Sequence, residues 1–153
     1  MYAISESLLV NRPGERPLTR EQAWQGLVMK AENALPFVAA MESCEIVERY
    51  PDGFLREIVL RGDRMRERIT FTPPVQVRFE RTDDSRFPGW ITNLLSDSEQ
   101  GLVLTFTFAI RFPGVEEGSA EEKRRGDAVR ASYVSAVRST IDRTRELATE
   151  GAL

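Results

Sequence analysis

The clearest alternation of hydrophobic and polar positions lies between residues 102 and 111. Every second position from Leu102 to Ile110 is large and apolar, while most positions between them are smaller or polar. A period of two is typical of a β-strand with one buried face. Weaker alternations extend back to residue 43, and residues 2–10 have the composition of a further strand. The pattern therefore predicts one strand near the start and six between residues 43 and 111.

Turn residues separate these predicted strands. Proline presets the backbone for a turn and glycine accepts a positive φ angle, so their clusters mark chain reversals. The predicted breaks are Asn11-Arg12-Pro13-Gly14, Pro51-Asp52-Gly53, Arg61-Gly62, Pro73-Pro74, the polar run Asp83-Asp84-Ser85, and Ser98-Glu99-Gln100-Gly101. Reversals this short favour antiparallel neighbours.

Two capping-box spacings predict where helices begin. In a capping box, the side chain of the first residue accepts from the backbone N–H three residues later, and the side chain of that later residue accepts from the backbone N–H of the first. Thr19 and Gln22 have this spacing at the start of a first helix. Ser119 and Glu122 have it at the start of a last helix, which can extend to about Thr149. The apolar face of the first helix consists of Trp24, Leu27, Val28 and Ala31.

A second short helix is predicted directly after the first. Residues 33–36 interrupt the first helix, and Phe37, Val38 and Met41 repeat with helical spacing. Pro36 is acceptable in the first turn of such a helix, where its missing N–H is not needed.

The element order predicts an α+β fold: a seven-stranded curved antiparallel sheet wrapped around the long C-terminal helix, with two short helices after the first strand. We treat residues 1–153 as a single domain, since neither a repeat nor a linker is found. The inner face of the long helix consists of Ala131, Val134, Val137, Ile141, Thr144 and Ala148. These side chains are too small to fill a curved sheet, which favours a cavity, although a fully packed core remains the alternative.

The composition excludes several kinds of chemistry. The chain contains no histidine, which removes Ser-His-Asp and Cys-His catalysis and histidine-based metal sites. Cys44 is its one cysteine, so we expect no intrachain disulfide and no thiolate metal cluster. Glycine-rich phosphate motifs are absent, and we therefore expect no metal and no cofactor.

Charge and hydropathy limit the partners. The net charge of −3 offers no basic field for nucleic acid or for an anionic membrane surface. No apolar run approaches the roughly 18 residues that a membrane-spanning helix needs. Residues 1–6 lack the basic and then apolar regions of a signal peptide, so we expect a cytoplasmic protein. The oligomeric state is not determined by the sequence.

The most specific chemical signal is a pair of opposite charges on the apolar face of one hairpin. If Arg61-Gly62 is a two-residue loop, Arg56 lies directly opposite Glu67 on the neighbouring strand. A structural ion pair is one interpretation, although buried pairs stabilise little. Recognition of a polar ligand group by Arg56 is a second. The third makes Glu67 a general acid or base, the candidate catalytic residue.

Other candidates for the cavity wall are mostly aromatic. We expect Phe79, Trp90, Phe106 and Phe108 from the strands and Val134 from the long helix to line it. Aromatic residues on a strand face are also typical of an ordinary core, and this alternative stays open. Cys44 is interpreted as a small buried hydrophobe.

The chain also resembles a known family, the AtaL-like proteins, over roughly residues 5–145. The segments that carry the resemblance are Leu18-Thr19-Arg20-Glu21-Gln22-Ala23-Trp24-Gln25-Gly26-Leu27, Lys30-Ala31-Glu32-Asn33, Phe37-Val38, Cys44-Glu45-Ile46-Val47, Gly53-Phe54-Leu55-Arg56-Glu57, Glu67-Arg68-Ile69-Thr70 and Pro73-Pro74. The resemblance implies the helix-grip (SRPBCC) superfamily, which includes START domains, the birch-pollen-allergen fold and polyketide cyclases. It therefore favours the cavity over the packed core, and Arg56 and Glu67 fall on the family's pattern.

Three functions follow as hypotheses. The first is binding of a small hydrophobic molecule, such as a lipid, a polyketide or another compound of secondary-metabolite type, between sheet and helix. The second is a cyclase, dehydratase or hydrolase that uses Glu67 and Arg56 on such a ligand. The third is a protein-interaction module, which needs an exposed apolar patch.

Overall fold

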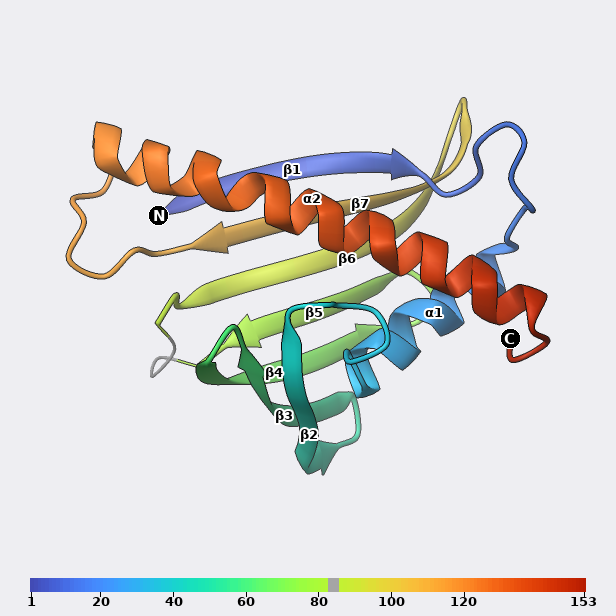
Figure 1. Ribbon diagram of the computed structural model, residues 1–153, viewed down its shortest axis with the longest axis horizontal. Coiled ribbons are helices and arrows are strands. Elements are labelled where there is room, and N and C mark those ends of the chain that lie inside the picture. The colour runs from blue at the N-terminus through green and yellow to red at the C-terminus, as the bar shows by residue number, and fades with distance from the viewer. Residues whose placement is uncertain (83–85) are drawn as a thin grey trace.

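A curved sheet of seven antiparallel strands is crossed by a long C-terminal helix in the computed structural model, which describes residues 1–82 and 86–153 (Figure 1). The elements are β1 (Tyr2–Leu9), α1 (Arg20–Glu32), β2 (Met41–Tyr50), β3 (Gly53–Leu60), β4 (Asp63–Thr72), β5 (Gln76–Arg81), β6 (Gly89–Ser98), β7 (Gly101–Ile110) and α2 (Ala120–Thr149). The predicted α+β class, the seven strands and the long helix are confirmed. The polar run 83–85 lies outside the described residues.

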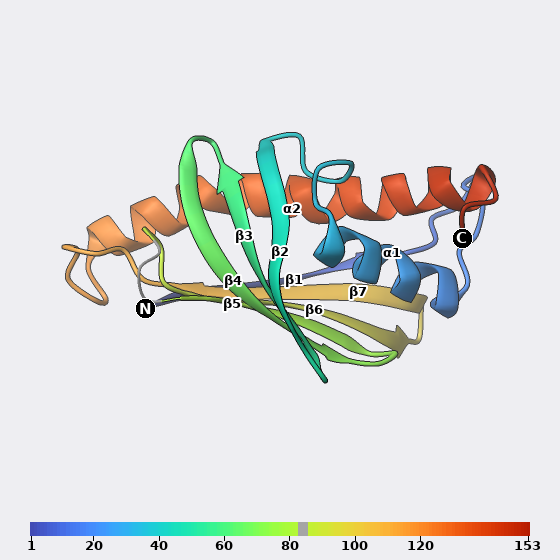
Figure 2. The same ribbon diagram turned by 90° about the horizontal axis from the view of Figure 1, so that it is seen from below.

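The strand order β1-β7-β6-β5-β4-β3-β2 places the first two strands at opposite edges of the sheet. The chain therefore crosses from one edge to the other between β1 and β2, and α1 lies on this crossing. Figure 2 shows β2, β3 and β4 curling up toward α2, with α1 between the sheet and the C-terminal half of α2. This curvature creates the concave face on which the site is built.

Capping fixes the start of both helices. At α1, Thr19 accepts from the Gln22 N–H while Gln22 accepts from the Thr19 N–H, so the predicted capping box is complete. At α2, Ser119 accepts from the Glu122 N–H. The Glu122 carboxylate instead accepts from the Gly118 N–H at 2.8 Å. The second box is therefore only half formed.

The predicted second short helix is wrong. Residues 35–37 form a turn, in which the Phe37 and Val38 N–H groups both donate to the Ala34 carbonyl, and β2 begins at Met41. So few residues separate α1 from β2 that a further helix would have to be nucleated for a single turn, which is unfavourable. Phe37 is buried, so the apolar spacing reflects packing of a turn.

Two glycines allow α2 to approach its neighbours closely. A Cβ at Gly26 of α1 would lie 2.1 Å from the Thr144 Oγ1 of α2, and a Cβ at Gly126 of α2 would lie 2.4 Å from the Tyr2 ring. The Tyr2 hydroxyl also donates to Asp127 at 2.7 Å. These contacts hold α2 against α1 at one end and against β1 at the other.

Most of the predicted inner face of α2 is buried. Val137, Ile141, Thr144 and Ala148 are buried, and Val134 is partly buried. Ala131 is exposed, contrary to the prediction, while the neighbouring Tyr133 packs inward against the core. In the described parts of the chain, no helix is both long and apolar enough to cross a bilayer.

Candidate functional site

The hairpin of β3 and β4 places two buried charges opposite each other, as its sequence predicts. Leu60 pairs with Asp63 across the Arg61-Gly62 turn, and Arg56 consequently pairs with Glu67. Arg56 donates to Glu67 Oε2 from Nε at 3.0 Å and from Nη2 at 2.7 Å. Both residues are almost fully buried on the concave face of the sheet.

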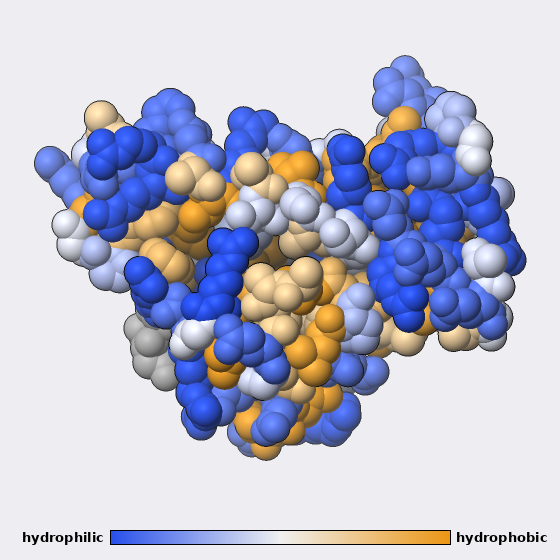
Figure 3. Space-filling model, in the orientation of Figure 1, coloured by the Kyte–Doolittle hydropathy of each residue, from blue (hydrophilic) through white to orange (hydrophobic). Residues whose placement is uncertain are grey.

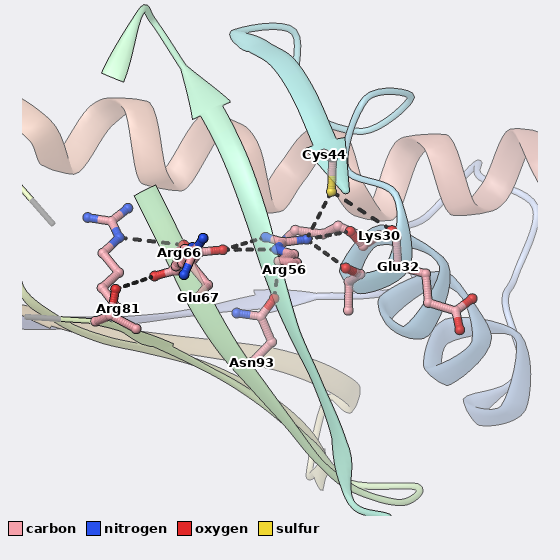
Figure 4. A network of polar contacts seen from close by, with 10 residues as sticks. Lys30, Glu32, Cys44, Arg56, Arg66, Glu67, Arg81 and Asn93 are labelled. Atoms are coloured by element: carbon pink, nitrogen blue, oxygen red, sulfur yellow. Dashed lines mark hydrogen bonds and ion pairs between the residues drawn. The ribbon is translucent and has the colours of Figure 1, made fainter. Parts of the chain in front are cut away.

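Arg56 also closes the C-terminal end of α1 (Figure 4). Its Nη1 donates to the carbonyl oxygens of Ala31, at 2.7 Å, and Lys30, at 3.2 Å. The last carbonyls of a helix have no partner within the helix and carry a partial negative charge, which a guanidinium group stabilises. The Cys44 sulfur lies 3.8 Å from the same nitrogen. Each nitrogen of the Arg56 guanidinium thus donates to a protein group, which supports the interpretation as a structural pair.

Glu67 is shared by two arginines. Its second oxygen lies 3.5 Å from the Arg81 Nε of β5. Burial by itself would raise the pKa of Glu67, but the charges and hydrogen bonds of Arg56 and Arg81 outweigh it and hold the pKa below its usual value. Burial likewise opposes the charge of Arg81, yet Tyr133 of α2 and Glu67 raise its pKa. Glu67 is therefore a carboxylate at neutral pH and has no proton to donate as a general acid.

Lys30 and Asn93 complete the cluster, and neither they nor Arg81 are among the site residues predicted from the sequence. The Lys30 Nζ, in the last turn of α1, donates to Asn93 Oδ1 at 3.1 Å and lies 5.5 Å from the centre of the Phe79 ring. Burial, followed by repulsion from Arg56, lowers the pKa of Lys30 to about 8. Asn93 is buried on β6, and its Nδ2 has no hydrogen-bond partner among the described residues.

A signal for these residues was present in the pattern. Asn93 occupies the inward position between Ile91 and Leu95, and Arg81 alternates with Phe79 on β5. A polar residue at an inward position of a strand is as informative as the Arg56–Glu67 pair. We refer to Lys30, Arg56, Glu67, Arg81 and Asn93 as the inner polar cluster.

Three of the predicted aromatic residues lie on the same face as this cluster. Phe79, Phe106 and Phe108 are buried on the concave face, and Phe106 pairs directly with Asn93 across β6 and β7. The Arg56 guanidinium lies 5.1 Å from the Phe79 ring centre, and Phe108 stacks on Tyr133 with 4.1 Å between ring centres. Val134 follows Tyr133 on α2 and is partly buried.

Trp90 does not belong to this face. It pairs with Glu80 and Ala109, which point away from the concave side, and the Arg78 guanidinium lies 5.2 Å from its ring centre. Its expected place in the cavity wall is wrong because the strand register turns Gly89, Ile91 and Asn93 inward instead. Cys44 is only partly buried, so its interpretation as a buried hydrophobe is correct only in part.

A groove with partly apolar walls opens beside the N-terminal half of α2. It encloses about 500 Å³, within the range of small-molecule sites. The lining residues are Arg86, Phe87, Phe112, Pro113, Arg125, Ala128 and Val129. Arg81 donates to the Phe87 carbonyl at 3.4 Å, and Val129 lies one turn before Tyr133 on α2. The groove wall is therefore continuous with the inner polar cluster.

The space-filling view shows the molecule hollowed between α2 and the strands that curl toward it, with apolar residues in the hollow (Figure 3). A second groove, of about 480 Å³, has mainly charged walls and lies near the C-terminal end of α2. Its lining residues are Glu15, Arg16, Asp142, Arg145, Glu146, Thr149 and Glu150. The charged side chains that line it form ion pairs with one another, as in the 2.9 Å contact between Arg145 and Glu15.

A curved sheet closed by a long helix, with polar groups on its inner face, defines the class of helix-grip proteins, and solved structures of this class are similar to the chain. The Zhui aromatase/cyclase from Streptomyces sp. R1128 has a TM-score of 0.70 at 14% identity, with 96% of this chain and 95% of that chain covered. The di-domain ARO/CYC StfQ from the steffimycin biosynthetic pathway has a TM-score of 0.68 at 14% identity, covering 98% of this chain and 51% of that one. Ara h 8.0201 has a TM-score of 0.63 at 12% identity, with 94% of this chain and 97% of that chain covered.

The family follows from the sequence itself. The model of the AtaL family, described as acetylaranotin biosynthesis cluster protein L, matches residues 4–151. The chain belongs to this family, as its resemblance predicted. No curated protein matches the chain.

Proposed function

We propose that the protein binds a small, mostly apolar molecule between the concave face of the sheet and α2, with a polar oxygen of that molecule directed at the inner polar cluster. The observation that carries the proposal is the charge balance of this cluster. Two cations, Arg56 and Arg81, share the carboxylate of Glu67, and the partly buried Lys30 adds a third positive charge to this otherwise apolar face. An excess of buried positive charge is costly unless an electron-rich group accompanies it.

The unpartnered Nδ2 of Asn93 supports the same proposal. A buried amide donor without an acceptor costs about 1–3 kcal/mol, and a ligand oxygen would remove this cost. Phe79, Phe106, Phe108 and Val134 supply the apolar contacts in this arrangement. The groove beside Val129 is the route by which the ligand enters.

The names of the relatives support a ligand of secondary-metabolite type. The family takes its description from a biosynthesis cluster, and two of the similar structures are aromatase/cyclases. We propose a lipid-like or polyketide-like ligand on this basis. The partner is thus a small molecule, and neither a metal nor a cofactor is required for the binding.

The test uses decan-1-ol and decanoate, which share one alkyl chain and differ in their polar end. Displacement of the fluorescent probe 1-anilinonaphthalene-8-sulfonate measures their binding. Val134→Trp adds bulk between α2 and the sheet and should weaken binding at least about tenfold, whereas Ala131→Trp on the exposed side of α2 should leave it unchanged. Circular dichroism checks that both variants fold. Equal binding by the two tryptophan variants, or no binding by the unmodified protein, would overturn the proposal.

Catalysis of a cyclase, dehydratase or hydrolase type is the second candidate, favoured by the aromatase/cyclases that share the fold over nearly the whole chain. In this version the ionised Glu67 acts as a base and Arg56 stabilises developing negative charge. Glu67→Gln separates the two candidates, because it would abolish turnover of a substrate. A rate that is unchanged in Glu67→Gln would remove Glu67 from the chemistry.

A further inference from the structure

Lys30 lies in an environment that keeps its amine available. Its Nζ has one hydrogen bond, to Asn93 Oδ1, and no carboxylate among the described residues lies within 4.0 Å of it. Besides burial, repulsion from the guanidinium of Arg56 lowers the pKa of Lys30, and attraction to Glu67 opposes this shift. Desolvation and a neighbouring cation both lower the pKa of a lysine, so its amine becomes neutral and nucleophilic at a lower pH than that of an exposed lysine.

The second lysine of the chain provides the contrast. Lys30 and Lys123 are the two lysines of the sequence. Lys123 lies on the exposed side of α2, where its Nζ pairs with Asp127 at 2.5 Å and its pKa is raised. The pKa values of the two lysines are thus shifted in opposite directions. Lys30 alone of the two has the surroundings of a nucleophile.

Asn93 presents a second group that matches this chemistry. Its Oδ1 is held by Lys30, so its Nδ2 necessarily lies close to the same amine, and Nδ2 is buried without a partner. Addition of an amine to a carbonyl places negative charge on the carbonyl oxygen. The Lys30 amine can therefore approach the carbon of a C=O group while the unpartnered N–H of Asn93 donates to its oxygen.

We infer that Lys30 forms an imine with an aldehyde or ketone carbonyl of the hydrophobic ligand. The inference rests on the proposed function, since the apolar wall must first bring the carbonyl to the amine. The neutral Nζ attacks the carbonyl carbon while the oxygen accepts from Asn93 Nδ2, and one proton passes from nitrogen to oxygen to give a carbinolamine, whose nitrogen gives up its second proton to the departing hydroxyl. The C–O bond then breaks, water leaves with both protons, and a C=N bond remains. No oxidant or reductant takes part, and hydrolysis reverses the reaction.

The experiment exposes the full-length protein to decanal at about pH 7.5 in the presence of cyanoborohydride, which reduces an imine to a stable secondary amine. Peptide mapping by mass spectrometry then locates the alkyl group. Lys30 should be modified at least about tenfold more than Lys123, because a larger fraction of its amine is neutral at this pH. Lys30→Arg should abolish the adduct at this position, and Lys123→Arg should leave it unchanged.

Propanal serves as the matched control reagent, since it has the same carbonyl without the long chain. The preference for Lys30 should be several times smaller with propanal, because the larger neutral fraction of Lys30 favours both aldehydes, whereas the apolar wall raises the local concentration of decanal alone. Asn93→Asp places a carboxylate beside Nζ in a side chain of the same shape. It should hold Lys30 as a cation and lower the adduct yield about tenfold.

The outcomes distinguish this inference from the proposed function. Displacement of the fluorescent probe by decan-1-ol reports binding without any covalent step. If decan-1-ol binds and decanal modifies Lys30 no more than Lys123, the imine is wrong and the binding site stands. If decan-1-ol does not bind, the proposed function fails as well. An equal preference for Lys30 with propanal and decanal would mean a reactive amine without a ligand site and would overturn the inference.

Discussion

Arg56 connects three elements through one guanidinium group. It pairs with Glu67 of β4, donates to the carbonyls of Lys30 and Ala31 at the end of α1, and faces the Phe79 ring of β5. Each of these partners is buried or partly buried, so water cannot replace the guanidinium when it is removed. The residue is therefore important for stability whatever the cluster binds.

Arg56→Met tests this role. We expect it to lower the free energy of unfolding by about 3–5 kcal/mol, because Glu67 and the α1 carbonyls lose their main donor. The double variant Arg56→Met/Glu67→Leu should lose less, since no uncompensated carboxylate remains. Urea unfolding measures both. Arg66→Met is the control, because among the described residues this exposed side chain pairs with Glu57, and its loss should change stability by no more than about 0.5 kcal/mol.

A double variant that is as unstable as Arg56→Met would show that capping of α1, and not the charge pair, accounts for the loss. Loss of stability in Arg66→Met equal to that in Arg56→Met would contradict the structural role.

The two lysines should titrate separately. Lys30 is expected to lose its proton near pH 8, whereas Lys123 keeps its proton beyond 10.5. The unfolded chain holds the Lys30 proton up to about 10.5, so it binds more protons than the folded chain in this window. The free energy of unfolding of the native protein, relative to Lys30→Met, should therefore rise between about pH 8 and 10.5. NMR of selectively labelled lysine follows each titration directly, and coincident curves would contradict the expectation.

At the scale of elements, the two helices depend on each other through Gly26. The Thr144 side chain of α2 occupies the position that a Cβ at Gly26 would take. This contact holds the C-terminal half of α2 over α1, and α1 in turn directs Lys30 toward the sheet. The position of the amine thus depends on the packing between the helices.

Gly26→Ala should destabilise the protein, although alanine is the better helix former by about 1 kcal/mol. A Cβ 2.1 Å from Thr144 Oγ1 forces the helices apart, and overpacking of this kind costs about 1–3 kcal/mol. Thermal unfolding measures the change. Adding Thr144→Ala removes the two closest atoms and should recover part of the loss. A Gly26→Ala variant more stable than the native protein would show that the helices adjust without cost.

At the scale of the whole molecule, curvature decides which residues meet. The strand order brings Arg56 of β3, Arg81 of β5 and Asn93 of β6 onto one concave face, and the crossing between the edges adds Lys30 of α1. Figure 2 shows how the curled strands and α2 enclose this face. A flat sheet with the same register would leave Lys30, Arg56 and Arg81 in water. Their charges would then be solvated, and no carboxylate would be needed to offset the cost of burial.

The sequence by itself determined the local features of this protein. The alternation of apolar residues and the turn at Arg61-Gly62 fixed the register that sets Arg56 opposite Glu67, because side chains alternate with a period of two. The Thr19 capping box fixed the start of α1 in the same way. Such features depend on residues close together in the chain, where geometry leaves few alternatives.

Contacts between distant segments were decided only by the tertiary structure. The carbonyls of α1 that Arg56 reaches, and the Asn93 amide that Lys30 reaches, lie far away in the sequence. Trp90 was misplaced because the polar and apolar pattern of β6 is weak, and only pairing with β5 and β7 sets which side faces inward. No local rule encodes such pairings, since they depend on how the sheet curves and where the helices pack on it.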